Sequence, residues 1–466
     1  MSDAKSIFLQ DAKKTTADGE QRAFIRKALG GYYVNRDLQK ARFRSWERAR
    51  DAAAIAKWTA VNDLEQQLTK FVSQFEKNGG KVHWAQDAEE ARQIILKIAQ
   101  DAKAKAIIKS KCMTSEEIHL NDALEKAGYG VVESDLGEFI QQLRQEAPYH
   151  FVFHCMHVKR EAISELFTKH LGTAPTNSPE ELTMIARRHL RQLYVDADIG
   201  ISGANFLVAE TGQISITENE GNARLTTALP KIHIALSGIE KVVRNLDDLA
   251  ILLPMLATAG AGQPMTCYNT LYSGPRLKGE CDGPEQFHIV LLDNGRTRLL
   301  ANPEQRDALH CIRCGACLNV CPIFKNIGGL AYGTTYQGPI GSVITPHFRG
   351  LQQWNHLSGA SSLCGACTDA CPVRIDLHHH LLHNRRDAVK AAPTLFDRVF
   401  HYGFNFVIQR PKLFAFGGKV FRSTLPLLKK LPLPYLRPWL QTRDLPAAPA
   451  KSFREQWQSS AHEQSR

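Results

Sequence analysis

The stretch Cys311-Ile-Arg-Cys314-Gly-Ala-Cys317-Leu-Asn-Val-Cys321-Pro322 has the spacing C-x2-C-x2-C-x3-C-P. Three thiolates at this spacing can hold one corner of an iron–sulfur cube, and the fourth, which precedes the proline, points away toward a second cluster. Four cysteines this close together and followed by proline are rarely a zinc site. The stretch therefore predicts iron–sulfur clusters in the C-terminal third of the chain.

A second motif, Cys364-Gly-Ala-Cys367-Thr-Asp-Ala-Cys371-Pro372, ends as the first does, but Ser361 stands where a first cysteine would fall. If the ligands cross over, one cluster takes Cys311, Cys314, Cys317 and Cys371, and the other takes Cys321, Cys364 and Cys367. The pattern does not identify the fourth ligand of this second cluster. Ser361, a water or a hydroxide could fill that position, or the cluster could be [3Fe–4S] rather than [4Fe–4S].

The remaining cysteines and the start of the chain bear on the compartment. Seven of the eleven cysteines fall between Cys311 and Cys371, and the other four are expected to be buried structural thiols (Cys112, Cys155, Cys267 and Cys281). The first residues contain no secretory signal, and the most apolar run, Leu246 to Ala259, is shorter than a membrane span and contains Pro254. We therefore expect a buried helix at this run and a cytoplasmic protein with reduced thiols.

The hydrophobic pattern divides the chain into four parts. Residues 1–70 are expected to form a basic helical arm, 71–300 an α/β domain, 301–390 the cluster domain and 391–466 a basic tail rich in proline and aromatic residues. In the second part, helix-period segments alternate with short apolar runs, which predicts an α/β layer with helices on both faces. The predicted strands are Lys81–Trp84, Ala106–Ile108, Val131–Val132, Phe151–Phe153, Phe206–Ala209, Ile214–Thr217, Ile232–Leu236 and Phe287–Leu292. The predicted helices are Ala88–Asp101, Ser115–Ala127, Lys159–His170 and Pro179–Leu193.

Polar strings follow several of these strands, at the ends where ligand sites form in open α/β sheets. They are Lys109–Lys111, Glu133–Glu138, His154 with His157, Glu210–Gly212 and Thr217–Arg224. Each string alone could be a turn or a helix cap. Together they predict a carboxylate-rich pocket for a small molecule.

The strings ESDLGEFIQQL, GISGANFLVAETGQISITENEGNARLTTALPKIHIALSGIEK, YNTLYSGP and CIRCGACLNVCP, in that order, resemble the lactate utilisation protein B family. The resemblance covers roughly residues 20 to 450. It implies a LUD domain, whose fold is similar to that of CoA transferases and formyltetrahydrofolate cyclo-ligase, followed by a mainly α-helical, ferredoxin-like double-cluster domain. The seven clustered cysteines match the ligand positions of the family.

The resemblance also implies a function. The family supplies the iron–sulfur subunit of an NAD-independent L-lactate dehydrogenase complex, which passes electrons from lactate oxidation to pyruvate through two clusters toward the respiratory chain. Its implied partners are a cysteine-rich subunit and a smaller LUD subunit. The sequence contains no G-x-G-x-x-G after a strand, so we assign no catalytic residue and expect a redox subunit whose oxidising chemistry lies elsewhere.

An alternative is a CoA-transferase-like or ligase-like enzyme with accessory clusters, whose catalytic carboxylate would be Glu210, Glu218 or Glu220. The net charge of +11 raises the third possibility of a protein that binds nucleic acid. No nucleic-acid-binding motif or basic stripe is present, so no nucleic acid is expected as a partner. From Arg385 to Arg443 the tail carries twelve Lys or Arg against two Asp. We expect this tail to dock on a partner subunit, with the inner face of the membrane near a quinone pool as the alternative.

Overall fold

The computed structural model describes residues 3–393, 395–430, 440 and 443–464. Contacts within the chain divide it into two units, Met1–Ala388 and Val389–Arg466. The predicted tail, 391–466, includes residues 394, 431–439, 441–442 and 465–466, which lie outside the described part.

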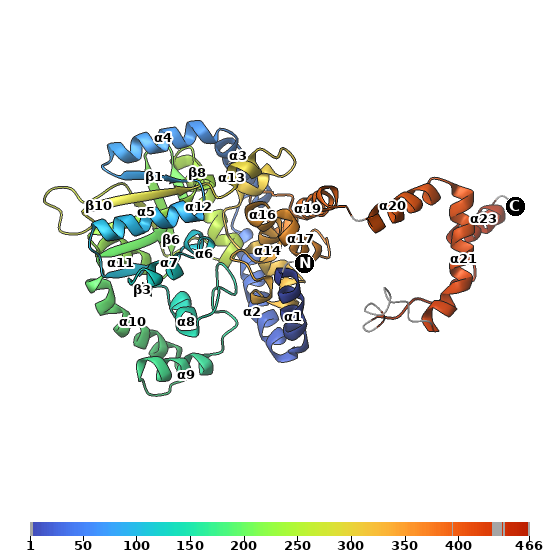
Figure 1. Ribbon diagram of the computed structural model, residues 1–466, viewed down its shortest axis with the longest axis horizontal. Helices are drawn as coiled ribbons and strands as arrows, with labels where there is room; N and C mark the ends of the chain where they lie inside the picture. The colour runs from blue at the N-terminus through green and yellow to red at the C-terminus, as the bar shows by residue number, and fades with distance from the viewer. Residues whose placement is uncertain (1–2, 394, 431–439, 441–442, 465–466) are drawn as a thin grey trace. The chain divides into compact units, whose positions relative to one another are not determined.

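The centre of the first unit is a six-stranded sheet in which every pair of neighbours is parallel (Figure 1). Its strands, in spatial order, are β1 (Lys81–Ala85), β10 (Gln286–Leu292), β7 (Ile232–Gly238), β4 (Ile199–Gly203), β2 (Ala106–Lys109) and β3 (Gly130–Glu133). Parallel strands require crossover connections, and the helices between them supply these. They are α5 (Ala88–Asp101), α6 (Met113–Glu117), α7 (Leu120–Lys126), α8 (Leu136–Arg144), α9 (Arg160–Leu171), α10 (Pro179–Asp196), α11 (Asn222–Ala228) and α12 (Leu246–Ala261).

Helices cover both faces of this sheet, as the alternating pattern predicted. On one face, Ala91, Ile95 and Ile98 of α5 pack with Val290 and Leu292 of β10. On the other face, α4 (Leu64–Lys77) packs with the intervening residues of the same strand. The buried side chains of α4 recur every three or four residues (Leu64, Leu68, Phe71 and Phe75). This spacing gives a helix one apolar stripe, and each such side chain contributes about 1.5–3 kcal/mol on burial.

A second, four-stranded sheet has the order β8-β5-β6-β9. Its strands are β8 (Val242–Val243), β5 (Phe206–Val208), β6 (Gln213–Glu218) and β9 (Tyr268–Tyr272). The pairs β5–β6 and β6–β9 are antiparallel. This sheet confirms the β-rich region predicted after Phe206, although β7 belongs to the parallel sheet. The helix predicted at Leu246–Ala259 is also confirmed, because α12 continues through Pro254.

Two predicted elements are wrong. The strand predicted at Phe151–Phe153 is a series of bends and turns. Nδ1 of His150 accepts hydrogen bonds from the backbone N–H groups of Val152 and Phe153, and such local bonds replace the ladder bonds of a strand. The helix predicted at Ser115–Ala127 is broken into α6 and α7, because His119 has a left-handed backbone with φ 51°. Strands β4, β8 and β9 were not predicted.

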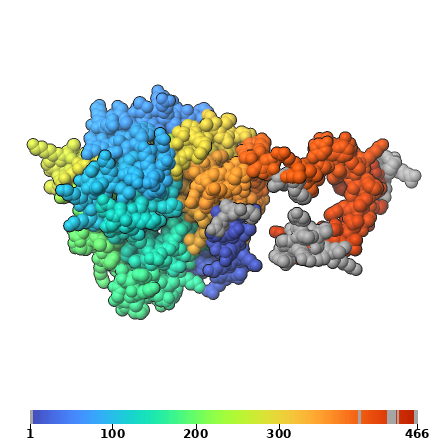
Figure 2. Space-filling model, viewed as in Figure 1, coloured from blue at the N-terminus to red at the C-terminus, as the bar shows by residue number. Residues whose placement is uncertain are grey.

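The N-terminal helices α1 (Asp3–Ala17), α2 (Gly19–Lys40) and α3 (Trp46–Asn62) pack on the cysteine-rich region (Figure 2). That region consists of short helices joined by turns: α13 (Arg296–Leu300), η2 (Arg306–His310), α14 (Ala316–Val320), α15 (Phe324–Ile327), η3 (Leu330–Tyr332), α16 (Gly338–Arg349), α17 (Leu351–Gly359), α18 (Ala366–Ala370) and α19 (Leu377–Ala391). The remaining short helix, η1 (Ile239–Lys241), follows β7. One apolar core joins the N-terminal helices, α12 and the cysteine motifs.

The second unit contains α20 (Leu395–Ile408), α21 (Pro411–Lys430) and α23 (Phe453–Gln464). Many of its apolar side chains are exposed, among them Tyr402, Phe414, Phe416 and Phe421. Arg422 of α21 forms an ion pair with Glu455 of α23, with 2.9 Å between Nη1 and Oε2.

Candidate functional site

The first cysteine motif wraps around a short helix. Arg313 and Gly315 have left-handed backbones, with φ 59° and 80°, and the chain then enters α14, which ends at Cys321. A Cβ added at Gly315 would lie 2.8 Å from the ring of His150, which belongs to the α/β domain. Glycine at this position therefore allows both the backbone turn and the close approach of the α/β domain.

The second motif repeats this backbone. Leu363 and Gly365 have φ 55° and 81°, in the places that Arg313 and Gly315 hold in the first motif, and α18 follows. The oxygen Oγ of Ser361 accepts a hydrogen bond of 3.2 Å from the Leu363 N–H. In the first motif, Sγ of Cys311 accepts the corresponding bond of 3.4 Å from the Arg313 N–H. The oxygen of Ser361 therefore accepts the same local hydrogen bond in the second motif as the sulfur of Cys311 accepts in the first.

Four thiols converge on one hollow between the motifs. Cys311, Cys314 and Cys317 of the first motif line it together with Cys371 of the second. The rest of its wall is apolar, contributed by Phe151, Ile312, Ile340, Pro372, Val373, Ile375 and Leu377 with Gly315. Helices α14 and α18 pack against each other, which brings Cys371 across to the first motif.

The other three thiols form a second group. Burial, together with the nearby Cys321 and Cys364, raises the pKa of Cys367 to about 11. Burial also raises the pKa of Cys321, again with a contribution from Cys364. Cys364 is exposed, whereas Cys321 and Cys367 are buried. The structure therefore groups the seven thiols as four and three.

These groups fit an iron–sulfur cofactor. Burial raises the pKa of Cys371 to about 12 and also raises that of Cys314, so neutral thiols are favoured unless a metal binds them. All eleven cysteines are free, and no disulfide competes for the seven. Backbone N–H groups of Phe324 and Ile375 approach the sulfurs of Cys321 and Cys371 at 3.5 and 3.4 Å. Such contacts are one of the protein's means of tuning a cluster.

Helix α3 braces the second motif. Nε of Arg50 donates a 3.0 Å hydrogen bond to the carbonyl of Cys371, and Nη2 donates to that of Thr368. Arg374, which the sequence places beside the motif, forms ion pairs with Glu47 and Asp51 of α3. The basic N-terminal helices therefore contact their own chain at the cysteine motifs.

A buried charge network connects the first motif to the α/β domain. The guanidinium of Arg296 binds Glu117 at 2.8 Å and Glu240 at 2.5 Å, and Glu240 also lies 3.3 Å from Nη2 of Arg313. Although burial opposes ionisation, the arginines hold the pKa of Glu240 at about 2. Both carboxylates and both guanidinium groups are therefore charged near neutral pH.

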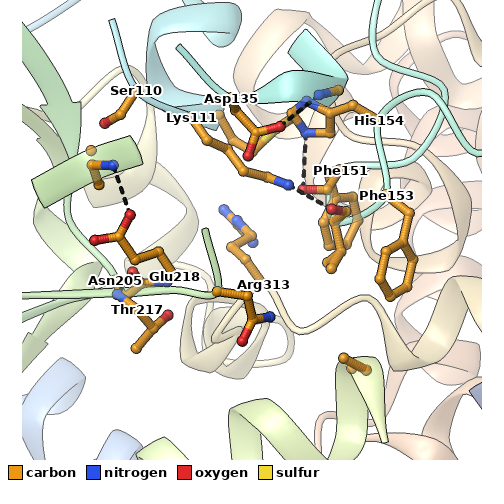
Figure 3. Close-up of a pocket in the computed structure, with 18 of the residues that line it drawn as sticks. Ser110, Lys111, Asp135, Phe151, Phe153, His154, Asn205, Thr217, Glu218 and Arg313 are labelled. Carbon is orange, nitrogen blue, oxygen red and sulfur yellow. Dashed lines mark hydrogen bonds between the residues drawn. The ribbon is translucent and has the colours of Figure 1, made fainter. Parts of the chain in front are cut away.

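A cavity of about 550 Å³ lies at the carboxyl ends of strands β2, β3 and β4 (Figure 3). Its walls come from these strand ends, from β6, from residues 151–156 and from the end of α12. Arg313 and Cys314 close one side, so Cys314 lines both this cavity and the cysteine hollow. The pocket of the α/β domain and the first cysteine group thus share a wall.

Most of the polar strings meet at this cavity. Its lining includes Ser110, Lys111, Asp135, His154, Thr217, Glu218, Asn219, Glu220 and Asn222. Other members of the strings do not line it. Lys109 is buried in ion pairs with Glu133 and Glu116, at 2.8 and 3.3 Å, and His157 stacks on Tyr149. Glu210 follows β5 and is exposed, so of the three carboxylates considered as catalytic only Glu218 and Glu220 reach the pocket.

The cavity contains charges of both signs. Although burial opposes ionisation, Lys111 holds the pKa of Asp135 below its usual value. Desolvation and the nearby Asp135 raise the pKa of Glu220 to about 7. Burial and the Lys111 charge lower the pKa of His154, which is therefore neutral, with its Nδ1 2.8 Å from Glu138.

The chain matches the LUD domain family over residues 68–292 and the 4Fe-4S dicluster domain family over residues 307–375. It is 41% identical to lactate utilization protein B of Shouchella clausii, over 96% of each chain. It is 41% identical to the Oceanobacillus iheyensis protein of that name, over 94% of this chain and 93% of the other, and 39% identical to the Bacillus subtilis protein, over 97% of each. The chain belongs to the lactate utilization protein B family.

This membership confirms the family resemblance seen in the sequence. The cavity lies in the LUD domain, and the two cysteine motifs lie in the dicluster domain, so this member carries iron–sulfur clusters next to its LUD pocket. No helix among the described residues is long and apolar enough to cross a membrane.

Some residues of the site were not predicted. Arg313, Asn205 and Tyr32 all line the LUD cavity, but none of them was among the predicted pocket residues. Tyr32 comes from α2, far away in the sequence, and no local signal reveals it. The scattered cysteines also differ from expectation: Cys112 is buried and Cys155 half-buried, but Cys267 and Cys281 are exposed.

Proposed function

We propose that this chain is the iron–sulfur electron-transfer subunit of an NAD-independent L-lactate dehydrogenase complex, and that it passes electrons from L-lactate toward the respiratory chain. The observation that carries the proposal is the pair of adjoining thiol groups beside the LUD cavity. The names of the relatives supply the link to lactate. Iron–sulfur clusters accept and release single electrons, and the chain's role is to hold them close together in a largely apolar setting.

Cys311, Cys314, Cys317 and Cys371 are the proposed ligands of a [4Fe–4S] cluster. The proposed ligands of the second cluster are Cys321, Cys364 and Cys367, with Ser361 as the fourth. The repeated backbone of the two motifs supports Ser361, because its oxygen accepts the same local hydrogen bond as the sulfur of Cys311. This assignment favours two [4Fe–4S] clusters over one [4Fe–4S] and one [3Fe–4S].

The proposed partners are a cysteine-rich subunit and a smaller LUD subunit of the same complex. The exposed apolar side chains and basic residues of α20 and α21 support docking of the tail on one of them. A peripheral position at the inner face of the membrane is the alternative for this surface.

The test is lactate-dependent reduction of the clusters in the complex reassembled from purified subunits without oxygen. We expect lactate to produce the EPR signals of reduced clusters, and Cys314→Ser to abolish lactate-dependent dye reduction while the LUD domain stays folded by circular dichroism. Cys267→Ser is the matched control, because Cys267 is exposed and lies outside both motifs. Zinc without iron or sulfide in the purified protein, or full dye reduction by the Cys314→Ser complex, would refute the proposal.

A second candidate is a CoA-transferase-like or ligase-like enzyme that acts in the LUD cavity. The observation in its favour is that Glu218 and Glu220 line that cavity. It predicts acyl-CoA turnover by the isolated chain that persists after the clusters are removed and is lost in Glu218→Gln.

A further inference from the structure

The LUD cavity contains a buried guanidinium whose hydrogen-bonding capacity is largely unused. The Arg313 side chain is 8% exposed and stacks on the Tyr336 ring, with 4.6 Å from Cζ to the ring centroid. Its Nη2 lies 3.3 Å from Glu240, whereas Nε and Nη1 are buried and have no hydrogen-bond partner among the described residues. Leaving charged donors buried and unpaired is costly, so this arrangement points to a ligand that accepts hydrogen bonds.

A second cation faces the same space. Nζ of Lys111 donates one hydrogen bond, 2.5 Å long, to the carbonyl of Val152. An ammonium group has three donors, so two remain. Figure 3 shows Lys111 and Arg313 with their charged ends directed into one open volume. Two cations in a partly closed cavity form a site for a carboxylate. Charge-assisted hydrogen bonds to such an anion are stronger than hydrogen bonds between neutral groups.

The neighbouring wall offers both acceptors and a donor. Asp135 and Glu218 each accept backbone N–H groups, from Gly137 in one case and from Ala223 and Arg224 in the other. The side-chain oxygen of Asn205 accepts the N–H of Thr217, which leaves its amide nitrogen to donate to a ligand. These groups can recognise an oxygen substituent next to a carboxylate.

We propose that the LUD cavity binds a small carboxylic acid that carries a hydroxyl or oxo group on the carbon next to the carboxylate. The carboxylate lies between Lys111 and Arg313, and the adjacent oxygen faces Asn205 and Asp135. The inference rests on the proposed function, and it places the binding site for the substrate of that function in this chain. Because Cys314 lines both the cavity and the cysteine hollow, the bound acid lies beside the first cluster.

The test is binding of L-lactate and of pyruvate to the full chain, purified with its clusters and without oxygen, by isothermal titration calorimetry. We expect saturable binding of at least one of the two acids and a change in the EPR spectrum of the first cluster on binding. Propanoate, which lacks the second oxygen, should bind at least tenfold more weakly. Lys111→Met should weaken binding about tenfold to a hundredfold, as expected for loss of a charge-assisted bond, and Lys111→Arg should retain most of it.

Lys105→Met is the matched control, because Lys105 is exposed and precedes β2, whereas Lys111 follows it. This variant should bind as the unmodified chain does. Absence of saturable binding to chain with full iron and sulfide content, equal binding by Lys111→Met, or equal affinity for propanoate would each overturn the inference. If Lys111→Met does not fold, Asn205→Ala serves instead and should weaken lactate and pyruvate binding but not propanoate binding.

This experiment separates the two proposals. Lactate-dependent cluster reduction in the complex without any acid binding to this chain would leave the electron-transfer function standing and refute the cavity assignment. Acid binding to this chain without lactate-dependent cluster reduction in the complex would support the cavity assignment and refute the electron-transfer function.

Discussion

At the scale of single residues, the distinctive feature is the serine that occupies a cysteine position. Ser361 and Cys311 begin two motifs of the same backbone form, and both accept a hydrogen bond from the residue two positions further on. An oxygen ligand in place of sulfur changes the charge and softness of the donor at one iron. If Ser361 ligates iron as proposed, the second cluster differs chemically from the first.

The role of Ser361 can be tested by iron analysis. Ser361→Ala should lose about one iron per chain, because the substitution removes the only protein ligand proposed for that iron, and the oxidised protein should show the EPR signal of a three-iron cluster. Ser361→Cys should keep the full iron content. Ser362→Ala, at the exposed neighbouring position, is the control. An unchanged iron content and spectrum in Ser361→Ala would exclude this residue as a ligand.

Buried histidines make the stability of the LUD sheet depend on pH. His233 is buried on β7 and stacks on Phe287. Its Nε2 shares a hydrogen bond of 2.7 Å with Oγ of Ser202. Burial lowers the pKa of His233 to about 3, with a contribution from the nearby His288. In the unfolded chain its pKa is about 6.5, so below pH 6.5 the unfolded state binds one more proton. His233 therefore favours unfolding as the pH falls from 6.5 toward 3 and has no such effect above 6.5.

Within this pH range, His233 should lower the free energy of unfolding by roughly 1.4 kcal/mol for each unit by which the pH falls. Urea unfolding of the full chain at pH 5 and pH 7 should show the loss of stability at the lower pH, and the difference should shrink in His233→Gln. An equal pH dependence in the variant would show that His233 is not the group responsible.

At the scale of elements, close backbone packing joins the LUD domain to the cluster. Helix α12 ends against the first motif, where a Cβ added at Gly260 would lie 2.4 Å from the carbonyl oxygen of Cys314. The contact leaves no room for a side chain. The position of the motif over the LUD cavity therefore depends on a glycine in a helix, where glycine is otherwise unfavourable.

Gly260→Ala should destabilise the chain by about 1–3 kcal/mol, because the helix must move away from the motif. We also expect a lower iron content and a shifted EPR spectrum of the first cluster. Gly30→Ala, in α2, is the control: its added Cβ meets nothing within 4 Å, so this change should stabilise by about 0.5–1 kcal/mol. Equal effects of the two substitutions on stability would argue against the steric explanation.

At the scale of the whole molecule, the second unit is notable for its exposed apolar surface. Helices α20 and α21 expose large side chains such as Tyr402, Phe414 and Phe416. Exposed apolar side chains gathered on two helices indicate an interaction surface. The basic residues between them suit an acidic partner surface.

Phe414→Ser together with Phe416→Ser should reduce co-purification of the partner subunits, because each change removes apolar area from the proposed interface. The iron content and the LUD domain should be unaffected, since both side chains belong to the second unit. Gln409→Ala, a polar residue near the end of α20, should leave association unchanged. Retained association in the double variant, with loss of binding to anionic vesicles, would assign this surface to the membrane instead.

Much of the fold could be predicted from local patterns. The period-2 and period-3.6 patterns predicted most strands of the parallel sheet and the helices at Ala88–Asp101 and Pro179–Leu193, because each element carries its own apolar face. β4 was missed because glycines at both Gly200 and Gly203 dilute its apolar run. Residues 151–153 resemble a strand by composition, but the side chain of His150 takes their hydrogen bonds.

The sequence by itself determined the cysteine pattern, the family and the α/β layer, because ligand spacing and hydrophobic period are properties of neighbouring residues. Only the tertiary structure decided that Lys111, Asn205 and Arg313 face one cavity, that Glu210 lies outside it and that Cys314 separates it from the cysteine hollow. These groups come from segments as far apart in the sequence as Lys111 and Arg313, which are separated by 202 positions. They meet because the parallel sheet collects strand ends at one edge and α12 holds the first motif against that edge.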